Sequence, residues 1–358
     1  MWYTAVMRVY MQTRKYILIA LAALAVISGI TGCRSGGGDP DAGQIEQVYS
    51  FEDWDLTPVR RDGFTDYPVI IGEGTDYPLK GILSIPDELV GDGATPGTPA
   101  VVLVHGSGPI NMDTEVYGIT VFKDIAEHLA KNGVAVLRYD KRTFAHGAKL
   151  VEQFGDDLTV WEETIEDAIR AKMLLEQNEL VDPNRIYVLG HSLGGMLAPR
   201  IVSEGGFAGG IIMAGSPRSL LEIIYDQNLY FIDLQRPSAT RRLSLLAQVE
   251  RARAANFTLP AKYIAEMDAH PAEGYLAGTD KPFLILQGGK DFQVYAATDF
   301  EMYKTIAGGR ENIELHLYDD LTHLFTLSTM EKPTLEDYAA GAKVDGAPLR
   351  DIVDWLKK

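Results

Sequence analysis

The sequence of 358 residues predicts an α/β fold with a mostly parallel central sheet, helices on both faces and an inserted helical cap. First, strand-like apolar runs alternate with helical periodicity from Val101 onward, which is typical of a parallel sheet. Second, glycine-rich or polar loops follow several of these runs directly. Third, residues 216–279 are too many for a short crossover between two strands. With no internal repeat, these observations favour one domain with a cap.

The N-terminus has the pattern of an export signal. Arg14 and Lys15 precede an apolar run at 16–30, which is shorter than the ~20 residues of a membrane span. Such a run suits the apolar region of a secretory signal peptide. Met11 begins a more typical signal than Met1, so translation that starts at Met11 and omits residues 1–10 is an alternative.

Ile30-Thr31-Gly32-Cys33 resembles a bacterial lipoprotein processing site, with residues 1–32 as the signal. Cleavage before Cys33 would leave a thiol that receives lipid, which predicts an exported protein held by lipid in the bacterial envelope. Cys33 is the only cysteine, so a disulfide within the chain is impossible. The alternatives are an ordinary signal peptide that happens to contain Cys33 and an uncleaved anchor. Residues 33–50, rich in glycine near their start, are expected to be a flexible tether.

The folded body is predicted to consist of residues 51–215 and 280–358, with the cap at 216–279 between them. Strands at 67–72 and 79–85 would form an antiparallel edge, and later strands at 100–104, 134–139, 186–189, 209–213, 282–287 and 313–318 the parallel part. Two amphipathic helices are expected in the cap, one with Leu221, Tyr225, Leu229 and Ile232 on one face, the other beginning with Leu243, Leu246 and Val249. Tyr225, Tyr230 and Phe231 are candidates for lining a pocket under that cap.

The composition excludes some partners. The formal net charge is −17, and removal of residues 1–32, which hold three basic residues and no acidic one, takes it to −20. No basic patch that could neutralise phosphates is apparent, so nucleic acid is not an expected partner. A hydrophobic content of 46% suffices for a large core.

The most informative stretch is Gly190-His191-Ser192-Leu193-Gly194-Gly195, which follows the apolar run at 186–189. It has the G-x-S-x-G pattern of a nucleophile elbow, in which a sharp strand-to-helix turn exposes a serine hydroxyl. The glycines suit the close contacts of such a turn. Ser192 is therefore the candidate nucleophile, although the pattern also occurs by chance and needs a base nearby.

A second glycine-rich segment, His105-Gly106-Ser107-Gly108-Pro109, follows the apolar run at 100–104. Acyl transfer builds negative charge on a carbonyl oxygen, and each preorganised N–H group that binds it contributes about 3 kcal/mol. The backbone N–H groups of Ser107 and Leu193 are the expected oxyanion donors.

Asp291 and His323 follow the strands expected at 282–287 and 313–318 and are the candidate acid and base. The order Ser, Asp, His is that of one known class of serine hydrolase, and all three residues lie just after strands, where an α/β sheet gathers its site. His191 and His105 are expected to be structural, and His146 and His270 are weak alternatives. Of the other acids, Asp319 and Asp320 lie too close to His323, and Asp140 is expected to form ion pairs with its neighbours Lys141 and Arg142.

On these motifs the chain resembles the α/β-hydrolases of the bacterial esterase type that carry an HGSGP loop, with dienelactone-hydrolase-like and serine-peptidase-like relatives. The resemblance covers about 64–356 and includes 102–109, 136–142, Gly190–Gly195 with Ala198-Pro199, 287–291 and 323–325. It implies a triad of Ser192, Asp291 and His323. One departure is Leu321-Thr322 before the histidine, where relatives often have a small residue and an asparagine.

The predicted function is a serine hydrolase that cleaves carboxylic esters of small or medium acyl chains through an acyl-enzyme. No metal or organic cofactor is expected, because the chain has no H-E-x-x-H motif, no cysteine cluster and no dinucleotide-binding glycine pattern. Two alternatives stay open: a peptidase or amidase with the same triad, and a surface lipoprotein that binds without turnover. The expected partners are a small ester and the membrane, and the sequence predicts no oligomeric state.

Overall fold

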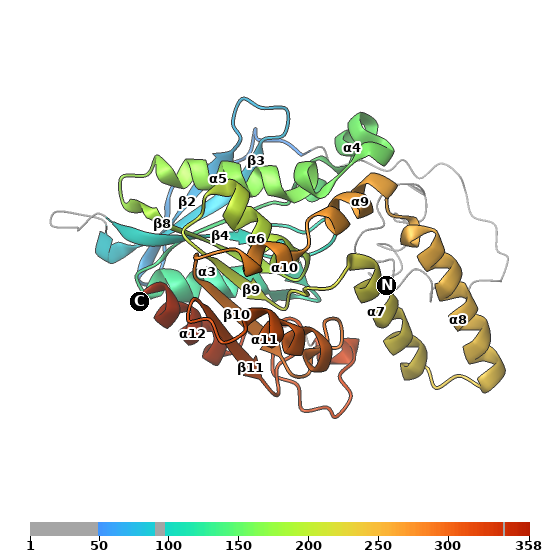
Figure 1. The fold of residues 1–358 in the computed structure, drawn as a ribbon. Helices are drawn as coiled ribbons and strands as arrows, with labels where there is room; N and C mark the ends of the chain where they lie inside the picture. Colours follow the sequence, from blue (N-terminus) through green and yellow to red (C-terminus); the bar gives the residue numbers. More distant parts are fainter. Residues whose placement is uncertain (1–48, 90–96, 339–340) are drawn as a thin grey trace.

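The computed structural model describes residues 49–89, 97–338 and 341–358. The predicted signal, Cys33 and all but the last two residues of the predicted tether lie outside these ranges. None of the described helices has the length and hydropathy that a membrane crossing requires. Figure 1 shows a central sheet between layers of helices.

The described strands form one large sheet in the order β1-β2-β3-β7-β4-β8-β9-β10-β11, and a small β5-β6 hairpin. In chain order they are β1 (Val59–Arg60), β2 (Phe64–Ile71), β3 (Leu79–Pro86), β4 (Thr98–Val104), β5 (Glu115–Val116), β6 (Ile119–Thr120), β7 (Ala135–Tyr139), β8 (Val181–His191), β9 (Gly210–Met213), β10 (Phe283–Gly288) and β11 (Ile313–Tyr318). Neighbouring strands pair antiparallel along β1-β2-β3-β7 and parallel along β7-β4-β8-β9-β10-β11. The predicted antiparallel edge and parallel body are confirmed.

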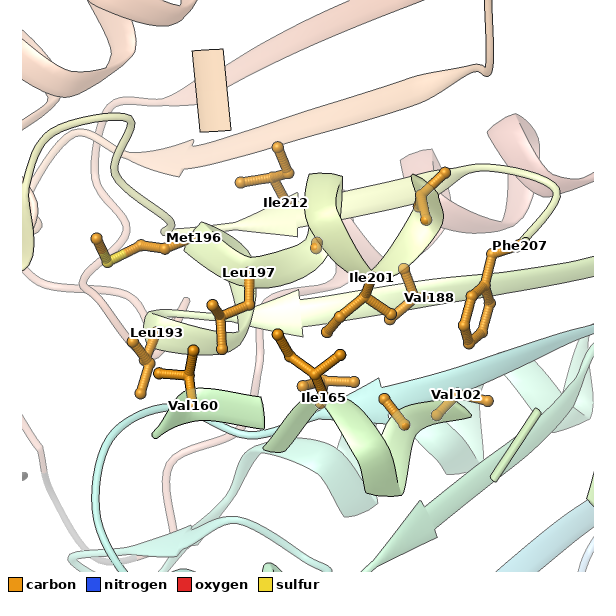
Figure 2. Close-up of a cluster of buried hydrophobic side chains, with 14 of the residues drawn as sticks. Val102, Val160, Ile165, Val188, Leu193, Met196, Leu197, Ile201, Phe207 and Ile212 are labelled. Carbon is orange, nitrogen blue, oxygen red and sulfur yellow. The ribbon is translucent and has the colours of Figure 1, made fainter. Parts of the chain in front are cut away.

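Helices cover both faces of this sheet. The helices outside the segment 216–279 are α3 (Val121–Lys131), α4 (Arg142–Phe154), α5 (Glu166–Glu176), α6 (Leu193–Gly205), α11 (Glu301–Ala307) and α12 (Gly346–Leu356) among the described residues. Val101 and Leu103 of β4 pack in a cluster with α3 and α12, whereas Val102 and Val104 pack in a second cluster with α5 and α6. Because side chains alternate along a strand, a strand covered on both faces must be apolar throughout, and β4 is buried at every residue. Figure 2 shows part of the cluster on the α5 and α6 face.

Several boundaries differ from those predicted. β2 begins at Phe64, three residues before the strand expected at 67–72, and β4 begins at Thr98, two residues before the strand expected at 100–104. Helix α4 was not predicted, because its glycine and polar residues hide the periodicity, and His146 at its centre has non-helical backbone angles. A π-helical turn, η3 (Trp161–Ile165), directly precedes α5.

Between β9 and β10 the chain forms α7 (Leu220–Leu234), α8 (Ala239–Ala254), α9 (Ala261–Ala269) and α10 (Ala272–Ala277), within the segment 216–279 predicted as the cap. α7 and α8 lie together at one end of the molecule (Figure 1). The buried face predicted for α8 is wrong at Leu243, which is 68% exposed. Leu245 and Val249 are the buried residues of this helix. Since α8 stands away from the sheet, only a narrow stripe of it is covered.

The first described residues are fixed to the sheet beside the end of β7. The Tyr49 hydroxyl donates to Asp140 and accepts from the Lys80 N–H, at 2.9 and 2.8 Å. The Lys80 ammonium also lies over the rings of Tyr49, Phe51 and Trp54, at 4.8–5.6 Å from their centroids. Cation–π contacts of this kind stabilise a partly exposed site by about 0.5–1 kcal/mol each.

Candidate active site

Ser192 lies on the sharp turn between β8 and α6. Its φ of +56° is in the left-handed region, which is uncommon for a residue with a side chain. A Cβ at Gly190 would lie 2.0 Å from the Gly194 carbonyl oxygen, and one at Gly194 would lie 2.2 Å from that of Val104. Both positions therefore require glycine. The turn leaves the Ser192 side chain half-buried rather than enclosed.

The structure brings Asp291 and His323 together. His323 Nδ1 lies 2.7 Å from Asp291 Oδ2, and both side chains are almost completely buried. Asp291 Oδ1 accepts the backbone N–H groups of Gln293 and Val294 at 2.7 and 2.9 Å, and Oδ2 accepts the Gln287 amide at 3.0 Å. These donors hold the carboxylate so that it orients the imidazole.

Two further histidines form hydrogen bonds with backbone oxygens of the loops at the site. His191 Nε2 donates to the backbone oxygen of His323 at 2.8 Å, and His105 Nε2 donates to that of Asn111 at 3.2 Å. Burial lowers the pKa of each imidazole to about 3, so both are neutral donors at physiological pH. Both contacts fit the structural role that is predicted for His191 and His105.

The loop after β4 passes beside Ser192. β4 and β8 are neighbouring parallel strands with Val104 opposite Gly190, so the loops that follow them start side by side. A Cβ at Gly106 would lie 3.6 Å from Ser192 Oγ. Leu193 is the first residue of α6, and a helix leaves the N–H groups of its first turn without partners in the helix. The structure thus places Ser107 on the loop that passes beside the hydroxyl, and Leu193 at the start of the helix that follows it.

The segment after β7 holds this loop. Lys141 Nζ donates to the Gly106 oxygen at 2.9 Å, and the Lys141 N–H donates to the Ile110 oxygen at 3.1 Å. The Thr143 hydroxyl donates to the Gly108 oxygen at 3.4 Å, and the Met112 N–H donates to Asp140 at 2.8 Å.

Asp140 makes no ion pair with its neighbours among the described contacts, so that expectation is wrong. Its carboxylate accepts from Met112 and Tyr49, whereas Lys141 and Arg142 pair with carboxylates of η3 and α5. Consecutive residues after a strand point in different directions, which separates their partners.

The remaining candidates have other partners. His146 Nε2 donates to the Pro78 oxygen, and His270 Nδ1 lies 2.6 Å from the Tyr275 hydroxyl. Asp319 and Asp320 are exposed. Within the described ranges, no cluster of three or more His, Cys, Asp or Glu residues could hold a metal ion.

A cavity of about 130 Å³ lies between the start of α6 and the segment 216–279. Its walls come from Met196 and Leu197 on one side and from 216–220 and 267–272 on the other. Met196 is one helical turn after Ser192, and its N–H donates to the Ser192 oxygen at 3.0 Å. Tyr225, Tyr230 and Phe231 are absent from these walls, because Tyr225 bonds to Glu250 and the other two pack around Phe292.

Three buried polar residues near the site were not predicted from the sequence: Gln287, Lys141 and Glu163. Gln287 is an amide within an otherwise apolar strand, and this contrast was the available signal. Nothing local indicated that Lys141 would reach Gly106 or that Glu163 would be fully buried, since both depend on contacts between distant segments.

Comparisons with known proteins agree with this fold. A model of the alpha/beta hydrolase family matches residues 101–336. Esterase EstD of Thermotoga maritima is 38% identical over 266 residues, which are 73% of this chain and 62% of that protein, so the match spans less than two thirds of the relative. An esterase of Pyrococcus furiosus has a similar fold, with a TM-score of 0.51 and 18% identity over 84% of this chain and 97% of the other. An acylaminoacyl peptidase also reaches 0.51, at 15% identity over 83% of this chain and 42% of the peptidase.

Proposed function

Because this chain belongs to the alpha/beta hydrolase family, we propose that it is a serine hydrolase that cleaves carboxylic esters of small or medium acyl chains. The observation that carries the proposal is the buried 2.7 Å bond between Asp291 and His323, at the sheet edge where the Ser192 elbow lies. The 38% identity to an esterase supports ester substrates.

In the proposed mechanism, His323 takes the proton of Ser192 while Oγ attacks the ester carbonyl. The N–H groups of Ser107 and Leu193 bind the resulting oxyanion. His323 then gives the proton to the leaving alcohol, which leaves an acyl-enzyme, and activates the water that releases the acid. Asp291 keeps His323 in the required tautomer and stabilises its charged form.

We also propose that the protein is exported and held at the bacterial envelope by lipid on Cys33. The signal pattern in residues 1–33 supports this location. The acyl group of the substrate would occupy the cavity beside α6, because Met196 and Leu197 line it within two turns of the nucleophile.

The test is hydrolysis of a series of p-nitrophenyl acyl esters by the purified protein and its Ser192→Ala variant. We expect turnover with an optimum at one chain length, reduced by at least ~10³-fold in the variant. Ser203→Ala is the matched control, since Ser203 is exposed on the same helix, and its activity should equal that of the parent. Equal activity of Ser192→Ala would refute the mechanism.

A further inference from the structure

Lys141 and Glu163 form a buried ion pair that the proposed mechanism does not use. Lys141 Nζ lies 3.0 Å from Glu163 Oε1, and the two side chains are 2% and 0% exposed. A buried ion pair adds little stability compared with well-packed apolar residues, because both charges lose their hydration. The presence of this pair therefore calls for a role other than stability.

The pair lies directly against the proposed oxyanion loop. Besides Glu163, Lys141 Nζ contacts the Gly106 carbonyl oxygen, to which it donates a hydrogen bond of 2.9 Å. This carbonyl belongs to the same peptide unit as the Ser107 N–H. A trans peptide is planar, with its C=O and N–H on opposite sides, so a partner that fixes the oxygen also fixes the direction of the N–H.

We propose that Lys141 is a positioning residue that sets the oxyanion hole by holding the Gly106–Ser107 peptide in one orientation. Glycines at 106 and 108 give the loop the freedom to rotate this peptide. Rotation would take the Gly106 oxygen away from a buried ammonium and leave it with Glu163 alone, which is costly. The bond to a cation also polarises the peptide and strengthens its N–H as a donor.

Glu163 holds Lys141 in place and connects it to the segment 216–279. Glu163 lies on the π-helical turn η3, a feature that is often found at functional sites. The Tyr263 hydroxyl of α9 donates to Glu163 Oε2 at 2.5 Å, and Tyr263 is fully buried. Movement of α9 would thus be transmitted through Glu163 and Lys141 to the oxyanion loop.

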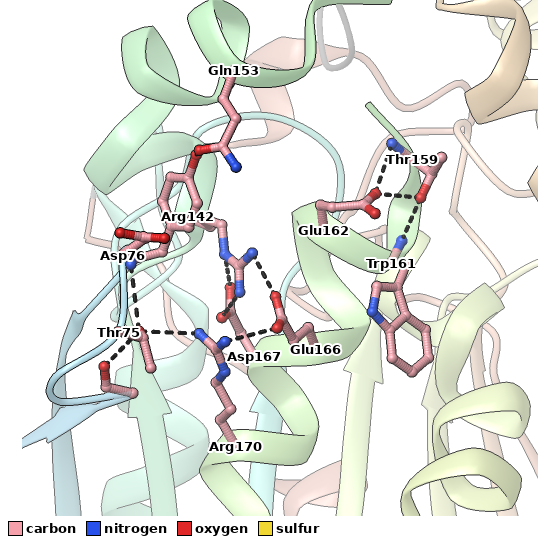
Figure 3. A network of polar contacts seen from close by, with 12 residues as sticks. Thr75, Asp76, Arg142, Gln153, Thr159, Trp161, Glu162, Glu166, Asp167 and Arg170 are labelled. Carbon is pink, nitrogen blue, oxygen red and sulfur yellow. Dashed lines mark hydrogen bonds and ion pairs between the residues drawn. The ribbon is translucent and has the colours of Figure 1, made fainter. Parts of the chain in front are cut away.

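The test compares Lys141→Met with Arg142→Met. Arg142 is the next residue, is equally buried, and pairs with Asp167 and Glu166 of α5 instead of the loop (Figure 3). We expect Lys141→Met to lower kcat for a p-nitrophenyl ester about 10- to 100-fold with KM nearly unchanged, since only the transition state carries the oxyanion. Arg142→Met should lose stability while the folded protein keeps its kcat.

A trifluoromethyl ketone supplies a second readout, because Ser192 adds to it and forms a stable oxyanion. Its affinity should fall in Lys141→Met by the same factor as kcat, and by a smaller factor in Tyr263→Phe. If Lys141→Met fails to fold, Lys141→Met/Glu163→Leu replaces the whole pair with apolar residues and should show the same loss of kcat and of ketone affinity.

The inference rests on the proposed ester hydrolysis, and the two can fail separately. Parent-like kcat and ketone affinity in Lys141→Met or in the double variant would overturn the role of Lys141 and leave the esterase intact. An equal loss of kcat in Arg142→Met would also overturn it, by showing a general effect of buried charge. A parent protein that neither cleaves an ester nor is labelled at Ser192 would overturn both.

Discussion

At the residue scale, the nucleophile elbow combines a strained serine with two neighbours that have no room for a side chain. A left-handed backbone at a non-glycine residue costs roughly 1–3 kcal/mol, and it persists only where its surroundings impose it. Here the Ser192 N–H donates to the Met213 oxygen at 2.9 Å, and its carbonyl accepts from Met196. Both bonds anchor the strained residue to regular structure.

Gly190→Ala should therefore prevent the elbow from forming, because the new Cβ would meet backbone atoms at 2.0 Å. We expect loss of soluble protein or a fall in melting temperature of several degrees, measured by thermal unfolding. Gly147→Ala in α4 is the matched control: its Cβ would meet nothing within 4 Å, and alanine should stabilise the helix by up to ~1 kcal/mol. Parent-like stability of Gly190→Ala would contradict this account.

The buried neutral histidines predict a loss of stability in acid. Burial lowers the pKa of His105 and His191 to about 3, whereas an unfolded histidine titrates near 6.5. The unfolded state thus binds more protons between these values, so the free energy of unfolding falls as pH drops from about 6.5 toward 3. Each histidine contributes a slope of about 1.4 kcal/mol per pH unit in that window. We expect the free energy of unfolding, measured with urea at several pH values, to depend less steeply on pH in His191→Asn than in the parent protein.

At the scale of elements, one arginine connects the segment 216–279 to the body. Arg218, just before α7, donates to Asp299 from Nε and Nη2 and to Asp226 from Nη1, at 2.7–3.1 Å. The Ser216 hydroxyl also donates to Asp299, whose side chain is fully buried. A buried carboxylate with these donors holds the start of α7 against the π-helical turn η5 (Ala296–Phe300).

Arg218→Ala should destabilise the protein by roughly 3 kcal/mol, since it leaves the Asp299 charge buried with fewer partners. Chemical denaturation would measure this loss. Arg242→Ala is the control, because the Arg242–Asp233 pair in the same segment is about half exposed and should contribute under ~1 kcal/mol. Equal losses in the two variants would refute the anchoring role of Arg218.

The cavity predicts how chain-length preference can be changed. Ala272 lies in its wall and is 7% exposed, so Ala272→Leu would fill part of the space. We expect the optimum of the p-nitrophenyl ester series to move to shorter acyl chains, with activity toward the acetate ester retained. Ala261→Leu, exposed on α9, should leave the profile unchanged. An unchanged profile in Ala272→Leu would show that the acyl chain binds elsewhere.

The strands were predictable because burial on both faces leaves an unbroken apolar run, as at 100–104, and the motif residues follow such runs directly. The buried face of α8 was not predictable, because the position of α7 decides which side of α8 is covered. The contact of Lys141 with Gly106 joins residues 35 apart, and Tyr263 meets Glu163 across 100 residues. Local pattern carries no information on such pairs.

At the scale of the whole molecule, the charge of the acidic body would not contribute to membrane attachment, which would be the role of the proposed lipid anchor. A net charge of −17 gives the chain no attraction to anionic lipid, so charge alone would not hold it at a membrane. Attachment would then depend on Cys33.

Cys33→Ser should abolish lipid attachment and release the protein from the membrane fraction. Metabolic labelling with an alkynyl fatty acid, followed by fractionation of the host cells, would measure both effects. The ester-hydrolysis activity of the released protein should match that of the parent, since Cys33 lies before the folded body. Continued membrane association of an unlabelled variant would instead indicate an uncleaved anchor.

Because Tyr49 is attached beside the end of β7, the proposed tether would join the folded body at that end of the sheet. Asp140, its partner, follows a parallel strand on the sheet edge that also carries the catalytic loops, whereas Lys358 pairs with Glu314 near the start of β11, at the opposite edge. The sixteen steps from Cys33 to Tyr49 reach at most roughly 55 Å. A protein immobilised through its N-terminus would thus be attached on the side of its catalytic loops, and one immobilised through its C-terminus on the opposite side.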